Sequence, residues 1–130
     1  MSRLPDWERR LSAYLADDGR NCFIWGESDC ALFATGGAAA MTGEDRVAHF
    51  RGVYTTRAGS ARALRDLGKG TLIKTMNALW EPVRPAFAQR GDMVMVRQAV
   101  GICMGRDAIF LGLDGFERAT RAEFTHGWRV

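Results

Sequence analysis

Cys30 is the residue whose setting in this sequence best suits nucleophilic chemistry. It follows Asp29 and opens an apolar run of small residues, 31–41, whose composition predicts a buried helix. Asp29 suits the N-cap position, because its carboxylate can accept hydrogen bonds from the free N–H groups of the first turn. A thiol at the first helical position lies at the positive end of the helix dipole, which favours the thiolate. Cys30 is therefore the candidate catalytic nucleophile.

A thiolate nucleophile needs a base within hydrogen-bond reach, and the sequence offers two histidines for that role. His49 lies in the loop expected after the helix, and His126 precedes a C-terminal run that could form a closing strand at the sheet edge. Either could reach a cleft next to Cys30, and either could equally be a surface or hydrogen-bonded loop histidine. Cys30 also has a purely structural interpretation, because free cysteine is among the most frequently buried residue types.

Trp25 and Asp29 are the candidate binding residues near this cysteine. Trp25 lies with Phe23 in the loop that leads into the expected helix. If Trp25, Trp80 and Trp128 are exposed, they could rim a groove that contacts a protein or a glycan. Buried positions would instead make them residues of the core.

The cysteine and histidine content predicts neither a disulfide framework nor a metal site. The chain has three cysteines and two histidines, with no Cys-x-x-Cys pair and no histidine close to a pair of cysteines. We therefore expect no metal and no cofactor, so that any chemistry at Cys30 would depend on protein side chains alone.

Composition indicates a globular protein, since the 130 residues are 47% hydrophobic and 25% charged. No apolar run approaches the roughly 20 residues of a membrane span, and the charged N-terminus predicts no signal peptide. The formal net charge is +3, and the cations are scattered along the sequence without a basic run interleaved with aromatic residues. Nucleic acid is therefore not an expected partner.

Helices are expected in the first part of the chain, and small residues mark the central one. Gly36 and Gly37 each cost a helix interior roughly 1 kcal/mol relative to alanine, which predicts that another element packs very close to them. The apolar spacing predicts helices over residues 5–17, 29–41, 60–67 and 71–79.

From Gly91 onward the pattern becomes typical of strands. Short apolar runs cover 93–96, 100–104 and 108–111, and Asp114-Gly115 is a hairpin signal because glycine accepts a positive φ. Helices first and antiparallel strands second predict an α+β domain, with the helices on one side of a small sheet. We expect a single domain over residues 1–130, with a helical half at about 5–80 and a sheet half at about 91–130.

The order of these motifs resembles that of the NlpC-type cell-wall peptidases, a branch of the papain-like fold. The resemblance covers roughly residues 22–112: Asp29-Cys30 heads the helix, Gly91-Asp92 precedes the first main strand, and Val100-Gly101-Ile102 lies in the next. It implies a papain-like fold in which the base position holds Ala99 instead of histidine. The orienting residue would come from the following strand, around 109–111, where no side chain is polar.

Taken whole, the chain is similar to a small phage and prophage tail-cluster family related to those peptidases. The features that carry this similarity are Trp25-Gly26, Asp29-Cys30-Ala31-Leu32-Phe33-Ala34, Met41-Thr42-Gly43, Phe50-Arg51-Gly52, Tyr54, Arg90-Gly91-Asp92 and Trp128-Arg129-Val130. The similarity implies a tail-tip or tail-assembly protein of siphophage-like particles or gene transfer agents. Its partners would be other tail or virion proteins, and its location the virion tail, or the host cytoplasm during assembly.

Two other functions follow from the same resemblance. An active cysteine peptidase or amidase would use Cys30 to cleave peptidoglycan peptides as a particle enters the cell. An assembly chaperone would bind tail proteins during construction and then leave them. The first of these requires a histidine within about 4 Å of the Cys30 sulfur, since a general base must lie within hydrogen-bond reach.

Overall fold

The computed structural model of the chain describes residues 3–17, 19 and 21–130. Helices precede most of the strands, and the fold class is α+β as predicted. In chain order the elements are α1 (Trp7–Ala16), α2 (Cys30–Thr42), η2 (Ala48–Phe50), α3 (Arg57–Leu67), α4 (Leu72–Leu79), β1 (Glu81–Val83), η3 (Pro85–Phe87), β2 (Met93–Val96), β3 (Ala99–Cys103), β4 (Asp107–Gly112), β5 (Gly115–Thr120), η4 (Arg121–Glu123) and β6 (Phe124–Arg129).

The strands form one six-stranded sheet in the order β1-β6-β2-β3-β4-β5, and all neighbours are antiparallel. The predicted hairpin joins β4 to β5, with Gly112 opposite Gly115 and Gly115 at φ 118°. The expected closing strand is β6, which lies inside the sheet. The sequence pattern did not predict β1, which contains Pro82; an edge strand tolerates a proline.

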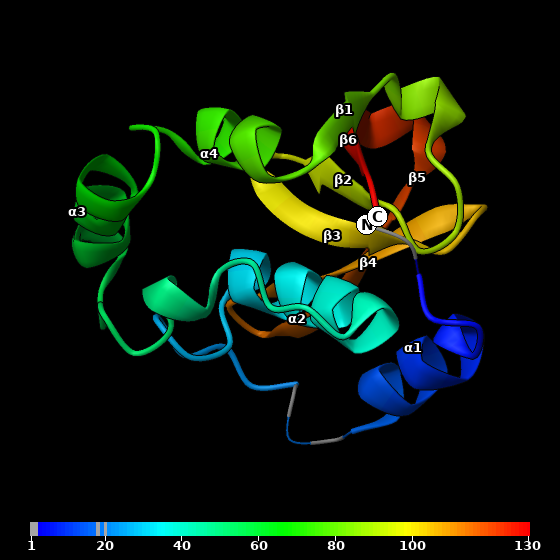
Figure 1. Cartoon of the computed structure of the whole chain (residues 1–130), viewed down its shortest axis with the longest axis horizontal. Helices are drawn as coiled ribbons and strands as arrows, with labels where there is room; N and C mark the ends of the chain where they lie inside the picture. Colours follow the sequence, from blue (N-terminus) through cyan, green and yellow to red (C-terminus); the bar gives the residue numbers. More distant parts are fainter. Residues whose placement is uncertain (1–2, 18, 20) are drawn as a thin grey trace.

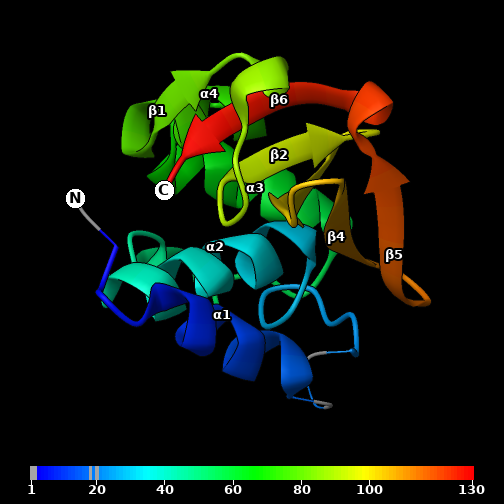
Figure 2. The same ribbon diagram turned by 90° about the vertical axis from the view of Figure 1, so that its right-hand side faces the viewer.

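Helix α2 lies between α1 and the sheet, where both of its sides are covered (Figure 1, Figure 2). This position explains why the helix is apolar around its whole circumference. The two glycines allow the close approach that the sequence predicted. A Cβ on Gly36 would lie 2.3 Å from the Tyr14 hydroxyl, and one on Gly37 would lie 2.6 Å from the Ile102 methyl group.

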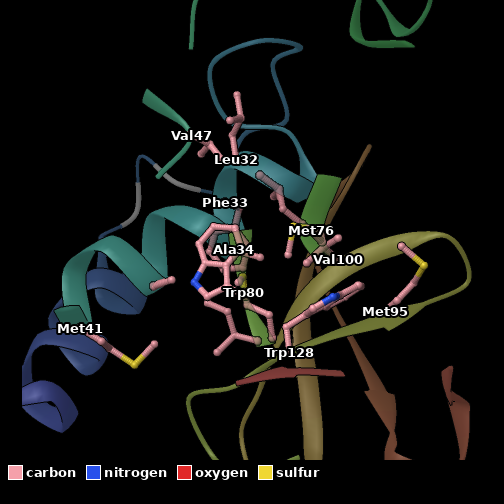
Figure 3. Close-up of a cluster of buried hydrophobic side chains, with 14 of the residues drawn as sticks. Leu32, Phe33, Ala34, Met41, Val47, Met76, Trp80, Met95, Val100 and Trp128 are labelled. Carbon is pink, nitrogen blue, oxygen red and sulfur yellow. The ribbon is translucent and has the colours of Figure 1, made fainter. Parts of the chain in front are cut away.

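Side chains on the two faces of the sheet belong to two separate apolar clusters. The cluster on the helix side includes Leu32, Phe33, Ala34, Met41, Val47, Met76, Trp80, Met95, Val100 and Trp128 (Figure 3). The opposite face carries Val94, Val96, Cys103, Ala108, Phe110, Ala119 and Phe124, which pack with Ala88 from the segment before β2. Trp80 and Trp128 are therefore core residues and do not rim a groove.

Asp92 joins the two described ends of the chain to the start of β2. Its carboxylate is fully buried and accepts hydrogen bonds from the Arg3 guanidinium (2.9 Å) and from the backbone N–H groups of Val130 (3.1 Å) and Gln89 (2.9 Å). Arg129 forms a second ion pair with it at 3.3 Å. The role of Asp92 is thus structural.

Helix α3 begins three residues earlier than the sequence pattern indicated. Thr56 is its N-cap, and the Thr56 hydroxyl accepts a hydrogen bond from the Gly59 N–H. Ala63 is the buried residue of this helix, which stands away from the sheet at one side of the molecule (Figure 1). None of the helices in the described residues combines the length and apolar character that crossing a membrane requires.

Candidate functional site

The head of α2 is fixed by Asp29, whose buried carboxylate has three hydrogen-bond donors. One oxygen accepts from the Leu32 N–H at 3.0 Å, which is the N-cap bond that the sequence predicted. The other accepts from the Gly26 N–H at 3.1 Å and from the Tyr54 hydroxyl. All three donors are neutral, so the negative charge is solvated by dipoles, and no described cation forms an ion pair with it.

Gly26 explains why the preceding loop carries the Trp-Gly pair. It has φ 82°, and a Cβ at this position would lie 1.8 Å from the Tyr54 carbonyl oxygen. The Gly26 carbonyl in turn accepts a hydrogen bond of 2.7 Å from the Gly52 N–H. Glycine is therefore needed both for the left-handed backbone and for the close approach of residues 52–54. Tyr54, which sequence reasoning did not assign to the site, reaches Asp29 through this contact.

Cys30 is half-buried at the first position of α2, with its thiol toward the Val100 N–H at the start of β3. Burial raises the pKa of this thiol, and the neighbouring Asp29 charge acts in the same direction. The N–H groups of Val100 and of the first helical residues oppose the shift without cancelling it. The helix terminus thus favours the thiolate as the sequence predicted, but burial outweighs it and the pKa of the thiol is raised.

The strand that faces Cys30 offers no base. Ala99 opens β3 beside Val100, and the buried residues of β4 are apolar. On the neighbouring strands, Val100 lies opposite Met95 and Met95 lies opposite His126. The imidazole of His126 is thus two strands away from the one that Cys30 faces.

The structure does not bring either histidine together with Cys30. His126 is half-buried, stacks on Trp128 with ring centroids 6.0 Å apart, and has its Nδ1 3.0 Å from the Thr125 hydroxyl. His49 is exposed on η2, with its ring 4.5 Å from that of Phe50. Among the described residues no hydrogen bond joins either imidazole to the thiol.

A largely apolar cavity of about 190 Å³ opens beside Cys30, between α2, η2, α3 and α4. The sequence did not predict it, because its walls come from segments far apart in the chain. Both candidate binding residues, Trp25 and Asp29, line it together with Cys30. The other lining residues are Ala31, Leu32, Thr35, Val47, Phe50, Tyr54, Arg57, Ser60, Leu64, Leu72, Thr75, Met76, Leu79 and Gln98.

The turn between β2 and β3 is strained and contributes Gln98 to the cavity wall. Arg97 and Gln98 have φ angles of 50° and 70°, a conformation that hairpins usually assign to asparagine and glycine. Neither the spacing nor the residue types of this turn signalled the conformation. Within the part of the chain that the structure describes, no group of three or more His, Cys, Asp or Glu side chains is placed to hold a metal ion.

These observations define an α+β domain with a neutral cysteine at a capped helix and an apolar cavity beside it. Residues 2–130 match the model of a domain of unknown function, DUF6950, and the chain belongs to this family. Comparison with curated proteins gave no match.

Proposed function

We propose that the protein is a structural or interaction module built on a degenerate cysteine-peptidase scaffold of the papain-like NlpC type. The observation that carries this proposal is that the half-buried Cys30 thiol has no histidine hydrogen-bonded to it among the described residues. Ala99 takes the motif position of the peptidase histidine, and its side chain packs on the other face of the sheet. A thiol without a base has few thiolate molecules at neutral pH, and nothing beside it can protonate a leaving amine. We place the module in the tail tip or tail assembly of a phage-like particle, which rests on the motif order described above.

Alkylation of Cys30 across a range of pH tests the degenerate site. We expect iodoacetamide to label native Cys30 slowly at and below neutral pH, and faster only well above the usual thiol pKa of about 8.5, because the pKa is raised. Cys22 is exposed and serves as the internal reference in the same sample. Rapid labelling of Cys30 below neutral pH would overturn the proposal.

The alternative function is an active cysteine peptidase or amidase, and the observation in its favour is that Cys30 lines a cavity. Hydrolysis of a peptidoglycan stem peptide by the wild type, lost in Cys30→Ala, would establish it. The placement in a tail is tested separately, by mass spectrometry of particles released from the organism that encodes the chain. Absence of the protein from those particles and from their assembly intermediates would remove the tail assignment alone.

A further inference from the structure

The outer wall of the cavity belongs to a strongly basic stretch, residues 57–74, which we call the basic arm. It comprises α3, the connection that follows, and the first residues of α4. Its single acid is Asp66, and its five cations are Arg57, Arg62, Arg65, Lys69 and Lys74. The arm alone thus has a formal charge of +4, whereas the whole chain has +3.

The cations of the basic arm are all exposed, and none of them forms an ion pair with another described residue. Several arginines elsewhere do form ion pairs. Arg3 and Arg129 share Asp92, Arg51 pairs with Asp45, and Arg118 pairs with Asp107. The positive charge of the arm is therefore left free to act on a binding partner.

The cavity beneath the arm is suited to an apolar group and has little to offer a polar one. The hydroxyls of Thr35, Thr75 and Ser60 already donate to backbone carbonyls of their own helices, at 2.7 Å in each case. The oxygens of Asp29 are occupied as well. Trp25, Arg57 and Gln98 are the remaining polar lining residues, so a polar ligand would replace only part of its hydrogen bonds to water.

The cavity size indicates what kind of apolar group would fit. Its volume of about 190 Å³ is below the range of roughly 300–1,000 Å³ typical of small-molecule sites. It exceeds the roughly 150 Å³ of an apolar cavity known to hold a benzene ring. One aromatic or branched aliphatic side chain is therefore a better match than a larger ligand.

The distribution of charge argues for a chain of anions above that apolar group. The 11 residues of α3 span roughly 16 Å, and the cations continue beyond it to Lys74. A single carboxylate or phosphate head group can neutralise only the nearest of them. An extended segment with several carboxylates can face the whole arm.

We propose that the cavity and the basic arm form a docking site for an acidic segment of a partner protein, with one aromatic or branched aliphatic side chain as its anchor. The anchor enters the cavity between α2 and α3, and the flanking carboxylates face the arm. This inference rests on the proposed function, because it names the class of partner that the interaction module binds. The occupied cavity would also cover Cys30.

The test uses fluorescein-labelled peptides and fluorescence anisotropy with the full chain. The probe is a short peptide of aspartate and glutamate with one central tryptophan. We expect saturable binding that weakens as ionic strength rises, and affinity about tenfold lower when alanine replaces the tryptophan. Equal binding of the two peptides, or no binding of either, would overturn the inference. Tighter binding of a single-stranded oligonucleotide of equal charge, or of dodecanoate, would do the same.

Two pairs of variants locate the site. Ser60→Phe fills the cavity and should weaken binding about tenfold, whereas Ala61→Phe places the same ring on an exposed position of α3 and should not. Arg62→Glu with Arg65→Glu reverses charge on the arm and should abolish binding. Arg84→Glu with Arg106→Glu makes the same charge change outside the arm, at exposed positions. This variant should retain most of the peptide binding. If the two variants of either pair changed peptide binding equally, the proposed location of the docking site would be contradicted.

Alkylation of Cys30 in the same samples separates failure of this inference from failure of the proposed function. If the peptide does not bind while Cys30 remains unreactive at neutral pH, only the docking site is lost. If Cys30 reacts rapidly at neutral pH, the degenerate-site proposal falls whatever the peptide does. With both correct, bound peptide should slow the labelling of Cys30 at alkaline pH and leave that of exposed Cys22 unchanged.

Discussion

Asp29 and Asp92 are two buried aspartates that each precede a regular element, and their surroundings differ in charge. Asp92 has two guanidinium groups and two backbone N–H groups around it at the start of β2. Asp29 has a tyrosine hydroxyl and two backbone N–H groups at the head of α2. The charge of Asp92 is compensated and holds the fold together, whereas the uncompensated charge of Asp29 acts on its neighbours.

The neighbours of Asp29 show the effect of that charge. Burial raises the pKa of the Tyr54 phenol, and the hydrogen bond to Asp29 raises it further. Burial likewise raises the pKa of Cys30, with the Asp29 charge adding to it. The Asp29 carboxylate therefore has two effects: as the N-cap it stabilises the helix, and as a nearby negative charge it disfavours the thiolate form of Cys30.

The largest expected effect comes from removing the compensated carboxylate. Asp92→Ala should lower the free energy of unfolding by about 3–4 kcal/mol, since it leaves two partly buried N–H groups and two guanidinium groups without this acceptor. Urea denaturation measures the change. The exposed Asp66→Ala on α3 is the control and should stay within about 0.5 kcal/mol of the wild type. If Asp92→Ala lost no more stability than the control, the structural role of the Asp92 contacts would be refuted.

Asp29→Ala should destabilise less, by about 2 kcal/mol, through the loss of the N-cap and of the acceptor for Tyr54. Asp29→Asn keeps a good capping residue and should lose about half as much. Denaturation of the two variants side by side checks the order. If the asparagine variant were the less stable of the two, the charge of Asp29 would have a structural role that its neutral donors do not indicate.

The asparagine variant also tests the electrostatic part of the comparison. Removing the negative charge beside Cys30 removes one cause of its raised pKa, so that Asp29→Asn should label with iodoacetamide at lower pH than the wild type. The exposed Cys22 controls for reagent and pH in each sample. A profile identical to that of the wild type would mean that burial alone keeps the thiol protonated.

The smallest expected effect concerns the backbone at the two ends of β2. Gly91, before the strand, has φ 94°, which glycine adopts without strain, whereas Arg97 and Gln98, after it, share the left-handed region without being glycine. Gln98→Gly should therefore raise the free energy of unfolding by about 0.5–1 kcal/mol, measured by thermal denaturation. Gln89→Gly, outside the left-handed region, should not be stabilising. A loss of stability in Gln98→Gly would show that the side chain contributes more than the strain costs.

Sequence reasoning succeeded where the signal was local. The Asp29 cap, the apolar run of α2 and the short apolar runs of β2 to β4 are each encoded within a few residues, and each was found. The start of α3 was missed because Arg57 to Gly59 carry no apolar pattern, and their helix depends on the Thr56 cap. Strand β1 was missed because its proline also terminates helices.

The site was predictable only in part, since its properties depend on tertiary contacts. The position of Cys30 on its helix followed from the sequence, but its pKa depends on burial against β3. The cavity requires four segments to meet, which no spacing along the chain reveals. The cations interpreted as scattered include five on one arm, and only the folded chain shows that none of these five pairs with a described acidic residue.

The contacts that join Arg3, Asp92 and Val130 have a consequence for how the chain can be rearranged. The Arg3 guanidinium donates to the Val130 carbonyl at 2.9 Å, which brings the first described residue next to the last. A short peptide linker could therefore join the ends without disturbing the sheet. A circularised chain, or a permuted one opened at the exposed turn of Leu113 and Asp114, should keep the same fold, with the new ends on the far side of the molecule.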